Sequence, residues 1–434
     1  MTGSPHFTPP PPPPPPAADR TSVASRFSRR HFLAGAGVLA AATAGGALAV
    51  TRPWQQAPVA GVDSAAGGKL VLVTLYGGND GLNTVIPYTD PAYPAARPSL
   101  GYKTSEVLPL SDGLGLNPKL AGLQSLWKSG NLAIVRGVGY PNPNLSHFAS
   151  MGIWQTANVE DGSGAGWLGR WLDSAGDGPE RAISVGATLP PVLRGEKEAA
   201  AAITGPAISF PGDRSFQEAY GAMQNAGQDR AGMAAAVASS GRDLLGVQQR
   251  LAGLGSSRGA GASKGAGSSN AGTAPTDLTG ALGVVSELIA TGSPAQVYQV
   301  SLESFDTHAT EKDNHERLLA DLDSAVTAFF KALKGNPHGA DVVLMTYSEF
   351  GRRPAENASG GTDHGTAAPL FVAGPKVKGG RFDGEEPSLT DLDANGNLKS
   401  NVDFRQVYAT ALERVVGTDP EQVLGGKFQT LGFV

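Results

Sequence analysis

The chain has 434 residues, of which 40% are hydrophobic and 17% are charged, and its formal net charge is −5. This length can bury a large core, and the slightly acidic balance, with no stripe of Lys and Arg, argues against a nucleic-acid partner. The sequence contains no cysteine, which excludes disulfides and thiolate metal sites, so any metal must be held by oxygen and imidazole ligands.

The first 60 residues predict an export signal and an unfolded leader rather than part of the fold. Arg29 and Arg30 are followed by Ala34–Val50, an uncharged segment of moderate hydrophobicity. This order is typical of a signal read by the twin-arginine translocation machinery. We therefore expect a periplasmic, cell-surface or secreted protein that keeps no stable membrane span after signal cleavage. A single membrane anchor is the alternative, because about 20 apolar residues can span a bilayer.

From Lys69 onward, apolar strand-like runs alternate with segments of helical periodicity. Strands are expected at 70–76, 132–135, 297–302, 341–346 and 369–373, and helices at 117–127, 147–154, 231–254 and 318–333. Such alternation predicts a mainly parallel sheet with helices on both faces, in one α/β domain over residues 69–434. Residues 255–275 are almost entirely small and polar, which predicts a flexible loop inside this domain, or a lid.

Polar side chains follow several of these strands, and in parallel sheets sites form beyond the carboxyl ends of strands. Asn79 and Asp80 lie in a glycine-rich loop after the first strand. Their oxygens are suitable ligands for a divalent cation, although the same residues also favour an ordinary turn.

Ser146 and His147 stand at the beginning of an expected helix. Ser146 either caps that helix or acts as a nucleophile toward an anionic substrate at the helix N-terminus. A Ser-His-Asp esterase is less supported, because no Gly-x-Ser-x-Gly elbow surrounds Ser146.

Asp306 and His308 follow the strand expected at 297–302. A carboxylate and an imidazole in this position suit zinc, manganese or iron, while the alternative is a capped turn with surface histidines. His315 lies among charged residues, so we expect it on a solvated helix face.

Glu349, Asp363 and His364 complete the candidate ligands near the C-terminus. The neighbouring Arg352 and Arg353 suit a phosphate or sulfate group, which guanidinium binds in bidentate fashion. Glu349 could also pair with one of these arginines.

Taken in order, these motifs resemble the DUF1501 family of exported bacterial proteins, over nearly all of the chain after Lys69. The resemblance is carried by Leu75–Gly81, Arg97-Pro98, Leu145–Phe148, Gly166–Arg170, Phe305–His308, Tyr347–Arg353, Gly361–Gly365 and Asp403–Tyr408. The family is similar in plan to the alkaline phosphatase and sulfatase superfamily. The resemblance therefore implies a three-layer α/β/α fold, one or two divalent ions (Zn, Mn, Ca or Mg) and hydrolysis of small anionic phosphate or sulfate esters.

The resemblance also implies roles for individual residues. Ser146 would be the nucleophile, and the groups near the substrate would be Asn79, His147, Arg352 and Arg353. The metal ligands would be Asp80, Asp306, His308, Glu349, Asp363 and His364. Either Glu349 or Asp363 stands where the superfamily keeps its late Asp, and the sequence leaves this open. A non-catalytic exported binding or structural protein on the same fold is the alternative function.

Overall fold

The computed structural model describes residues 67–175, 178–205, 214–226, 232–256, 275 and 277–434. The expected export signal at 1–60 and nearly all of the small-residue loop at 255–275 lie outside these residues. Both therefore stay predictions.

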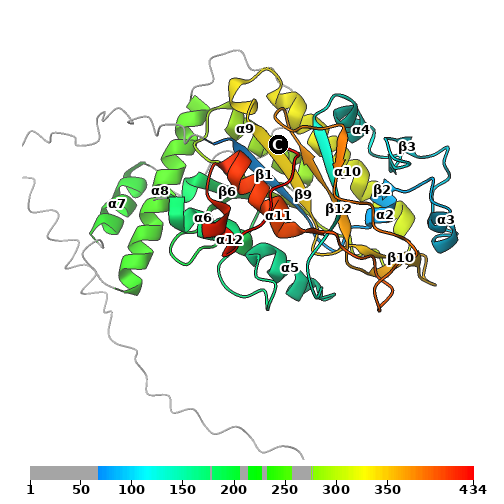
Figure 1. Cartoon of the computed structure of the whole chain (residues 1–434). Helices are drawn as coiled ribbons and strands as arrows, with labels where there is room; N and C mark the ends of the chain where they lie inside the picture. The colour runs from blue at the N-terminus through cyan, green and yellow to red at the C-terminus, as the bar shows by residue number, and fades with distance from the viewer. Residues whose placement is uncertain (1–66, 176–177, 206–213, 227–231, 257–274, 276) are drawn as a thin grey trace, which may run out of the picture. The chain divides into compact units, whose positions relative to one another are not determined.

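A nine-stranded sheet forms the centre of the fold (Figure 1). Its order is β13-β5-β12-β9-β1-β8-β6-β7, with β14 paired to β5. The strands are β1 (Lys69–Leu75), β5 (Leu132–Gly139), β6 (Ala182–Val185), β7 (Ala201–Ile203), β8 (Val297–Leu302), β9 (Val342–Tyr347), β12 (Ala368–Ala373), β13 (Arg381–Asp383) and β14 (Val402–Asp403). Only the pairs of β12 with β5 and β9 are antiparallel, so the predicted mainly parallel sheet is confirmed.

Helices and short strands connect the strands of the sheet. The helices are α2 (Gly81–Thr84), α3 (Ala92–Ala96), α4 (Ala121–Lys128), α5 (His147–Thr156), α6 (Trp167–Ala175), α7 (Arg214–Asn225), α8 (Met233–Ser256), α9 (Leu278–Ala290), α10 (Glu311–Leu333), α11 (Phe404–Thr410) and α12 (Pro420–Leu424). The short strands are β2 (Val85–Ile86), β3 (Leu108–Pro109), β4 (Gly115–Leu116), β10 (Arg352–Glu356) and β11 (Thr362–His364). The helices expected at 117–127, 147–154, 231–254 and 318–333 correspond to α4, α5, α8 and α10.

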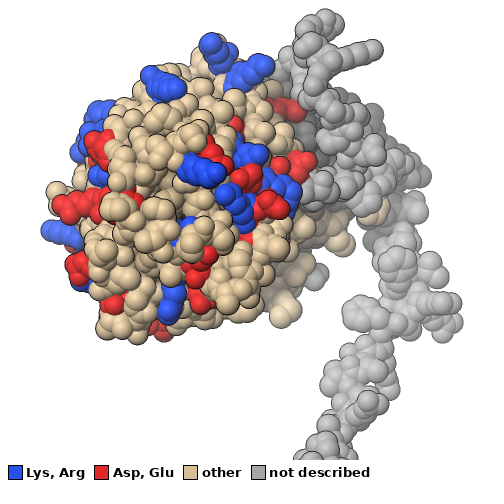
Figure 2. Space-filling model, turned by 90° about the vertical axis from the view of Figure 1, so that its right-hand side faces the viewer, with Lys and Arg blue, Asp and Glu red and all other residues tan. Residues whose placement is uncertain are grey.

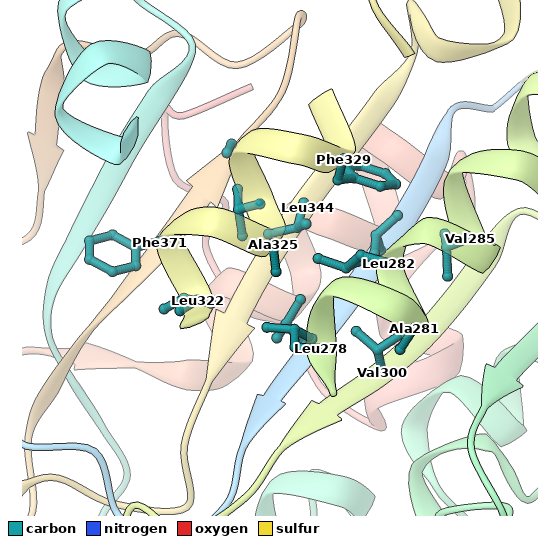
Figure 3. Close-up of a cluster of buried hydrophobic side chains, with 14 of the residues drawn as sticks. Leu278, Ala281, Leu282, Val285, Val300, Leu322, Ala325, Phe329, Leu344 and Phe371 are labelled. Carbon is teal, nitrogen blue, oxygen red and sulfur yellow. The ribbon is translucent and has the colours of Figure 1, made fainter. Parts of the chain in front are cut away.

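Alternate residues of β1 enter two different cores, because successive side chains of a strand point to opposite faces of the sheet. Val71, Val73 and Leu75 pack in the core that α4, α9 and α10 cover. Figure 3 shows part of this core, to which α9 contributes Leu282 and α10 contributes Phe329. Leu70 and Leu72 pack in the core that α5, α6, α11 and α12 cover. The fold is therefore the expected three-layer α/β/α arrangement.

The surface and the helices carry two further observations. On the face drawn in Figure 2, acidic and basic side chains are interspersed rather than gathered by sign. In the part of the chain that the structure describes, no helix combines the length and apolar character needed to cross a membrane.

The parallel strands β1, β8 and β9 end at the same edge of the sheet, where the loops 76–80, 303–310 and 348–351 follow them. The strand β12 runs in the opposite direction, so the β10–β11 hairpin that precedes it reaches this edge as well. The topology thus gathers the polar motifs at one place.

Candidate metal centre

An open cluster of histidines and carboxylates lies at this edge. It consists of His147 from the first turn of α5, Asp306 and His308 from the loop after β8, Glu349 from the loop after β9 and His364 from β11. Glu349 is buried, whereas the side chains of Asp306 and His308 are 46% and 44% exposed. The cluster is therefore open to solvent on the side of the β8 loop.

The Nε2 atoms of three histidines converge on the carboxylate of Asp306. His308 Nε2 lies 3.1 Å and His364 Nε2 3.3 Å from Asp306 Oδ1, and His147 Nε2 lies 3.4 Å from Asp306 Oδ2. The two Nε2 atoms of His308 and His364 are 2.9 Å apart. Among the described residues, His147, Asp306 and His364 form one of two groups whose ligand atoms lie close enough together to hold one metal ion, and this group does not include His308.

The opposite nitrogen of each imidazole faces an oxygen acceptor. Nδ1 of His147 lies 2.8 Å from Glu349 Oε1, and Nδ1 of His364 lies 2.8 Å from the carbonyl oxygen of Leu145. Nδ1 of His308 lies 3.6 Å from Asp363 Oδ1. Hydrogen bonds of this kind fix the tautomer of metal-binding histidines and orient their rings.

Glu349 itself is held by the turn after β1. Its two carboxylate oxygens accept hydrogen bonds of 2.9 and 3.1 Å from the backbone N–H of Gly77, and Oε2 accepts another from Ser348 Oγ. Gly77 has φ 118°, and a side chain there would collide with the backbone of Phe305 and Asp306. The glycine therefore permits the close approach of the β1 and β8 loops.

Arg352 forms hydrogen bonds that hold the loops around Asp306 in place. Its guanidinium donates to the carbonyl oxygens of Gly77, Gly78, Phe305 and Thr362 and, at 2.8 Å, to Asp306 Oδ1. Partial burial opposes ionisation of Asp306, but the bond and charge of Arg352 outweigh it and lower the pKa of that carboxyl. Because the Arg352 side chain is fully buried, it cannot reach a substrate, which corrects the expectation that it binds the anion.

A second, buried cluster lies behind the open one. Asp80 is fully buried, and both its oxygens accept hydrogen bonds from the guanidinium of Arg97, which is equally buried. Glu311 and His315, one turn apart on α10, lie beside Asp80 within the spacing of a metal-ligand group. Glu311 Oε2 accepts a hydrogen bond from Thr362 Oγ1.

The charges of the buried cluster cancel without an added cation. Burial opposes the charge of Asp80, but Arg97 overrides it and keeps the pKa of Asp80 well below its usual range. Burial and the neighbouring Asp80 raise the pKa of Glu311 to about 9, and burial lowers the pKa of His315 to about 4. At neutral pH the group is thus an Asp–Arg ion pair with a neutral carboxyl and a neutral imidazole.

This arrangement corrects the expected roles of Asp80 and Asn79. Asp80 is committed to Arg97 and does not join the open cluster, since its loop turns inward into α2. Asn79 is buried, and its side chain exchanges hydrogen bonds with Thr84 and lies 2.8 Å from His315 Nε2, so it faces the protein rather than a substrate.

The other predicted residues lie at the rim or outside the cluster. Ser146 is exposed and stands between Leu145 and His147, both of which contact cluster residues. Asp363 is 57% exposed and touches only the outer nitrogen of His308 among the cluster residues. Arg353 lies near Asp393, whose pKa is lowered mainly by a backbone hydrogen bond from Asn397 and to a lesser extent by the charge of Arg353. Neither Glu349 nor Asp363 reaches the converging Nε2 atoms.

Residues 68–430 match the family described as "Protein of unknown function (DUF1501)". The chain belongs to this family. No curated protein matches the sequence.

Several solved structures are similar to this DUF1501 protein. The C-terminal periplasmic domain of EptC from Escherichia coli, in complex with Zn, is 11% identical, with 72% of this chain and 75% of that chain covered and a TM-score of 0.35. The lipoteichoic acid synthase LtaP from Listeria monocytogenes is 12% identical, with 84% and 76% covered and a TM-score of 0.37. An alkaline phosphatase superfamily protein from Vibrio parahaemolyticus is 10% identical, with 77% and 67% covered and a TM-score of 0.34. Similarities at this level carry no argument about chemistry.

The residues of the DUF1501 protein fit a metal ion at the open cluster on their own geometry. Three imidazole nitrogens and a carboxylate converge, and His147 Nε2 is buried without a hydrogen-bond partner among the described residues. The buried cluster also holds orphaned atoms, Glu311 Oε1 and His315 Nδ1, but the Arg97 guanidinium already supplies its positive charge.

The positions of three residues in these clusters were not predicted from the sequence. His147 was expected near the substrate, yet its Nε2 joins the candidate ligands. His315 was expected on a solvated face, yet it is 1% exposed, and its spacing to Leu318, Leu319 and Leu322 on the apolar stripe was the signal that could have placed it. Glu311 lies one turn before His315, so the same helical spacing could have placed it on the buried face of the helix.

Proposed function

We propose that this DUF1501 protein is a metal-dependent hydrolase of small anionic esters, with its centre at the open cluster. The observation that supports this most directly is the convergence of three histidine Nε2 atoms on Asp306 at a solvent-open sheet edge. Imidazole and carboxylate ligands that leave one side open are typical of catalytic rather than structural metal sites.

Ser146 is the proposed nucleophile. Its hydroxyl is exposed at the N-terminus of the ten-residue helix α5, and its two chain neighbours both contact the cluster. The positive end of a helix favours an anionic group. In the proposed step, Ser146 Oγ bonds to the phosphorus or sulfur as the ester bond to the alcohol breaks, and water later releases the acid.

A bound metal ion would supply positive charge that favours ionisation of the attacking hydroxyl and stabilises the anionic oxygens. The chain's own residues position these groups. Glu349 and the Leu145 carbonyl orient two imidazoles, and Arg352 orients the carboxylate of Asp306.

The charge of the site favours substrates with a single negative charge. Asp306, Glu349 and Asp363 are acidic, whereas Arg352 is buried and committed to protein oxygens. Among the described residues, Arg352 is the one arginine in contact with the open cluster, so no guanidinium there is free to neutralise a second charge on the substrate. We therefore infer that sulfate monoesters and phosphodiesters fit better than dianionic phosphate monoesters.

The test is turnover of p-nitrophenyl sulfate, bis-p-nitrophenyl phosphate and p-nitrophenyl phosphate by metal-loaded protein. We expect hydrolysis of the first two that stops with chelator, with His364→Ala and with Ser146→Ala. Metal binding without turnover of any ester would refute the hydrolase and favour a binding protein. Labelling of Ser146 by a fluorophosphonate in the presence of chelator would instead indicate a metal-free serine hydrolase.

We also propose that the protein is exported by the twin-arginine route, on the strength of Arg29, Arg30 and the segment that follows. Replacement of both arginines by lysine should retain the protein in the cytoplasm. Unchanged export of that variant would refute the assignment.

A further inference from the structure

We propose that the helical hairpin formed by α7 and α8 is an interface through which two copies of this chain associate. The hairpin lies between β7 and β8 in the chain, and none of its described residues belongs to the open or the buried cluster. The proposed interface does not depend on the proposed function, because it uses other residues and is tested by the mass of the particle rather than by turnover.

Exposed apolar side chains gather on this hairpin. Among the described residues, six large hydrophobic side chains are exposed, and five of them lie on α7 or α8. They are Phe216, Met223, Met233, Val237 and Leu244, with exposed fractions from 39% to 84%. Single exposed apolar residues are ordinary on a protein surface, whereas a gathered set marks an interaction site.

The two helices lie side by side and run in opposite directions (Figure 1). A Cβ atom on Gly241 would lie 2.5 Å from the Gln224 side chain, and a Cβ atom on Gly221 would lie 3.4 Å from Leu245 Cδ1. The contact thus moves backward along α7 as it moves forward along α8. Arg242 adds a hydrogen bond from its guanidinium to the carbonyl oxygen of Gln224. The hairpin is therefore an antiparallel pair with a defined register.

The apolar side chains of both helices lie on one face of this pair. Each residue of a helix is turned by about 100° from the one before it. From the contact between the helices, the exposed apolar residues of α7 and of α8 are displaced in the same rotational sense, by roughly a quarter to a third of a turn. Because the helices are antiparallel, the same sense leads to the same face. Glu218 and Arg242 are displaced in the opposite sense, so these charges lie on the other face.

The spacing along α8 is that of a helix that packs on another helix. Met233, Val237, Ser240 and Leu244 follow one another at intervals of four, three and four residues, and all four are exposed. Such intervals form the seam of helix–helix packing. The protein's own core does not use this seam, since α8 reaches that core through Val247. The partner that fits is a helix, and the hairpin of a second copy presents one with the same spacing.

The size of this face is sufficient for a dimer. The helix α8 has 24 residues and α7 has 12. At about 1.5 Å per residue and about 10 Å between axes, the hairpin offers roughly 540 Å² to a partner. Two copies would bury roughly 1,100 Å² in total, which exceeds the ~1,000 Å² expected of a specific interface. Two paired hairpins would form an antiparallel four-helix bundle.

The charge of this face also favours a second copy. In a two-fold interface the same surface patch meets itself, so a charged patch would repel its own copy. The charged side chains described on the hairpin lie outside the apolar face, which removes this repulsion. A lipid surface fits less well, because helices that bind membranes carry Lys and Arg along the polar face beside the apolar one.

The experiment is sedimentation velocity of the full-length chain at concentrations from about 1 to about 100 μM. We expect a particle of twice the chain mass at the upper end. Phe216→Glu and Val237→Glu should each raise the dissociation constant about 100-fold or more, because each would bury a charge in an apolar interface. Ser239→Glu adds the same charge at an exposed position of α8 outside the apolar face, and should leave the dissociation constant unchanged.

A milder substitution gives a second measurement. The chain has no cysteine, so Val237→Cys introduces a single thiol. Its labelling by a maleimide should slow severalfold as the chain concentration rises through the range in which the dimer forms. Labelling of Ser239→Cys should not change over the same range. Equal behaviour of the two thiols would contradict the placement of Val237 in the interface.

Three further outcomes would overturn the assignment. They are a wild type that stays monomeric at about 100 μM, a dimer that persists in folded Phe216→Glu and Val237→Glu variants, and a monomer that binds phosphatidylcholine or phosphatidylglycerol vesicles until Val237→Glu abolishes binding. The last would assign the face to a lipid surface. Circular dichroism shows whether each variant is folded. Because the readouts are mass and labelling, absence of ester hydrolysis would refute the proposed function and leave this interface intact.

Discussion

Replacing Glu311 with glutamine should change how the stability of the protein depends on pH. Glu311 is fully buried beside the Asp80–Arg97 pair, and the pKa of its carboxyl is raised to about 9, first by burial and then by the charge of Asp80. The folded state therefore keeps a proton on Glu311 at neutral pH that the unfolded chain releases above its ordinary pKa of 4.5. Glutamine mimics the protonated carboxyl and cannot ionise.

The sign follows from proton counting. Between pH 4.5 and about 9 the folded state binds one more proton at this site than the unfolded state, so this contribution to stability is largest below pH 4.5 and declines as pH rises toward 9. One proton corresponds to about 1.4 kcal/mol per pH unit. From pH 6 to pH 8 the wild type should thus lose about 2.7 kcal/mol relative to Glu311→Gln.

Guanidinium unfolding followed by tryptophan fluorescence, with chelator present, measures this difference at pH 6, 7 and 8. Asp313→Asn removes an exposed carboxylate from the same turn of α10 and controls for loss of charge alone. If wild type and Glu311→Gln keep a constant difference in unfolding free energy across this range, Glu311 is ionised in the folded protein. The description of the buried cluster as neutral would then be wrong.

Three other substitutions test the site. Arg352→Lys should lower the unfolding temperature and weaken Co²⁺ binding at the open cluster about tenfold, because one ammonium cannot bridge four carbonyl oxygens and Asp306. An unchanged unfolding temperature in thermal melts and an unchanged Co²⁺ affinity in titrations would contradict the positioning role of Arg352. Ser146→Ala should abolish ester turnover while Co²⁺ affinity stays normal, and residual turnover above one hundredth would exclude Ser146 as nucleophile. Phe148 is 94% exposed beside His147 and should bind apolar leaving groups. Phe148→Ala should therefore raise KM for aryl esters several-fold and leave KM for methyl esters and the melting temperature unchanged. Equal KM values of the wild type and Phe148→Ala for aryl esters would refute this.

The central sheet could be predicted because its strands are continuous apolar runs. Residues 70–75 and 342–346 are buried on both faces, and only a central strand of a covered sheet needs such a run. The reversed direction of β12 could not be read in the same way, since residues 369–373 are apolar whichever way the strand runs. Direction depends on the β10–β11 hairpin before it, whose pairing is a long-range property.

The candidate site was predictable where a residue's role depends on its position after a strand. Asp306 and His308 were identified on that basis, and His364 was identified in the loop that follows Glu349; the structure brings the three together. Asp80 has the same kind of position, but its partner Arg97 is set by the path of the chain through α2 and α3, which no local pattern encodes. For His315, charged neighbours concealed a helical register that places the residue on the buried stripe.

The turn after β1 contributes to both clusters: its backbone atoms support the open cluster, and its acidic side chain belongs to the buried cluster. The N–H of Gly77 fixes Glu349, which orients His147, and the carbonyls of Gly77 and Gly78 fix Arg352, which orients Asp306. Three residues later Asp80 enters the protein and is neutralised by Arg97. The backbone of this loop therefore supports the open cluster, while its only acidic side chain is withdrawn from it. The open cluster is left with bare imidazole nitrogens and an ionised carboxylate, and a cation is what such a set of donors lacks.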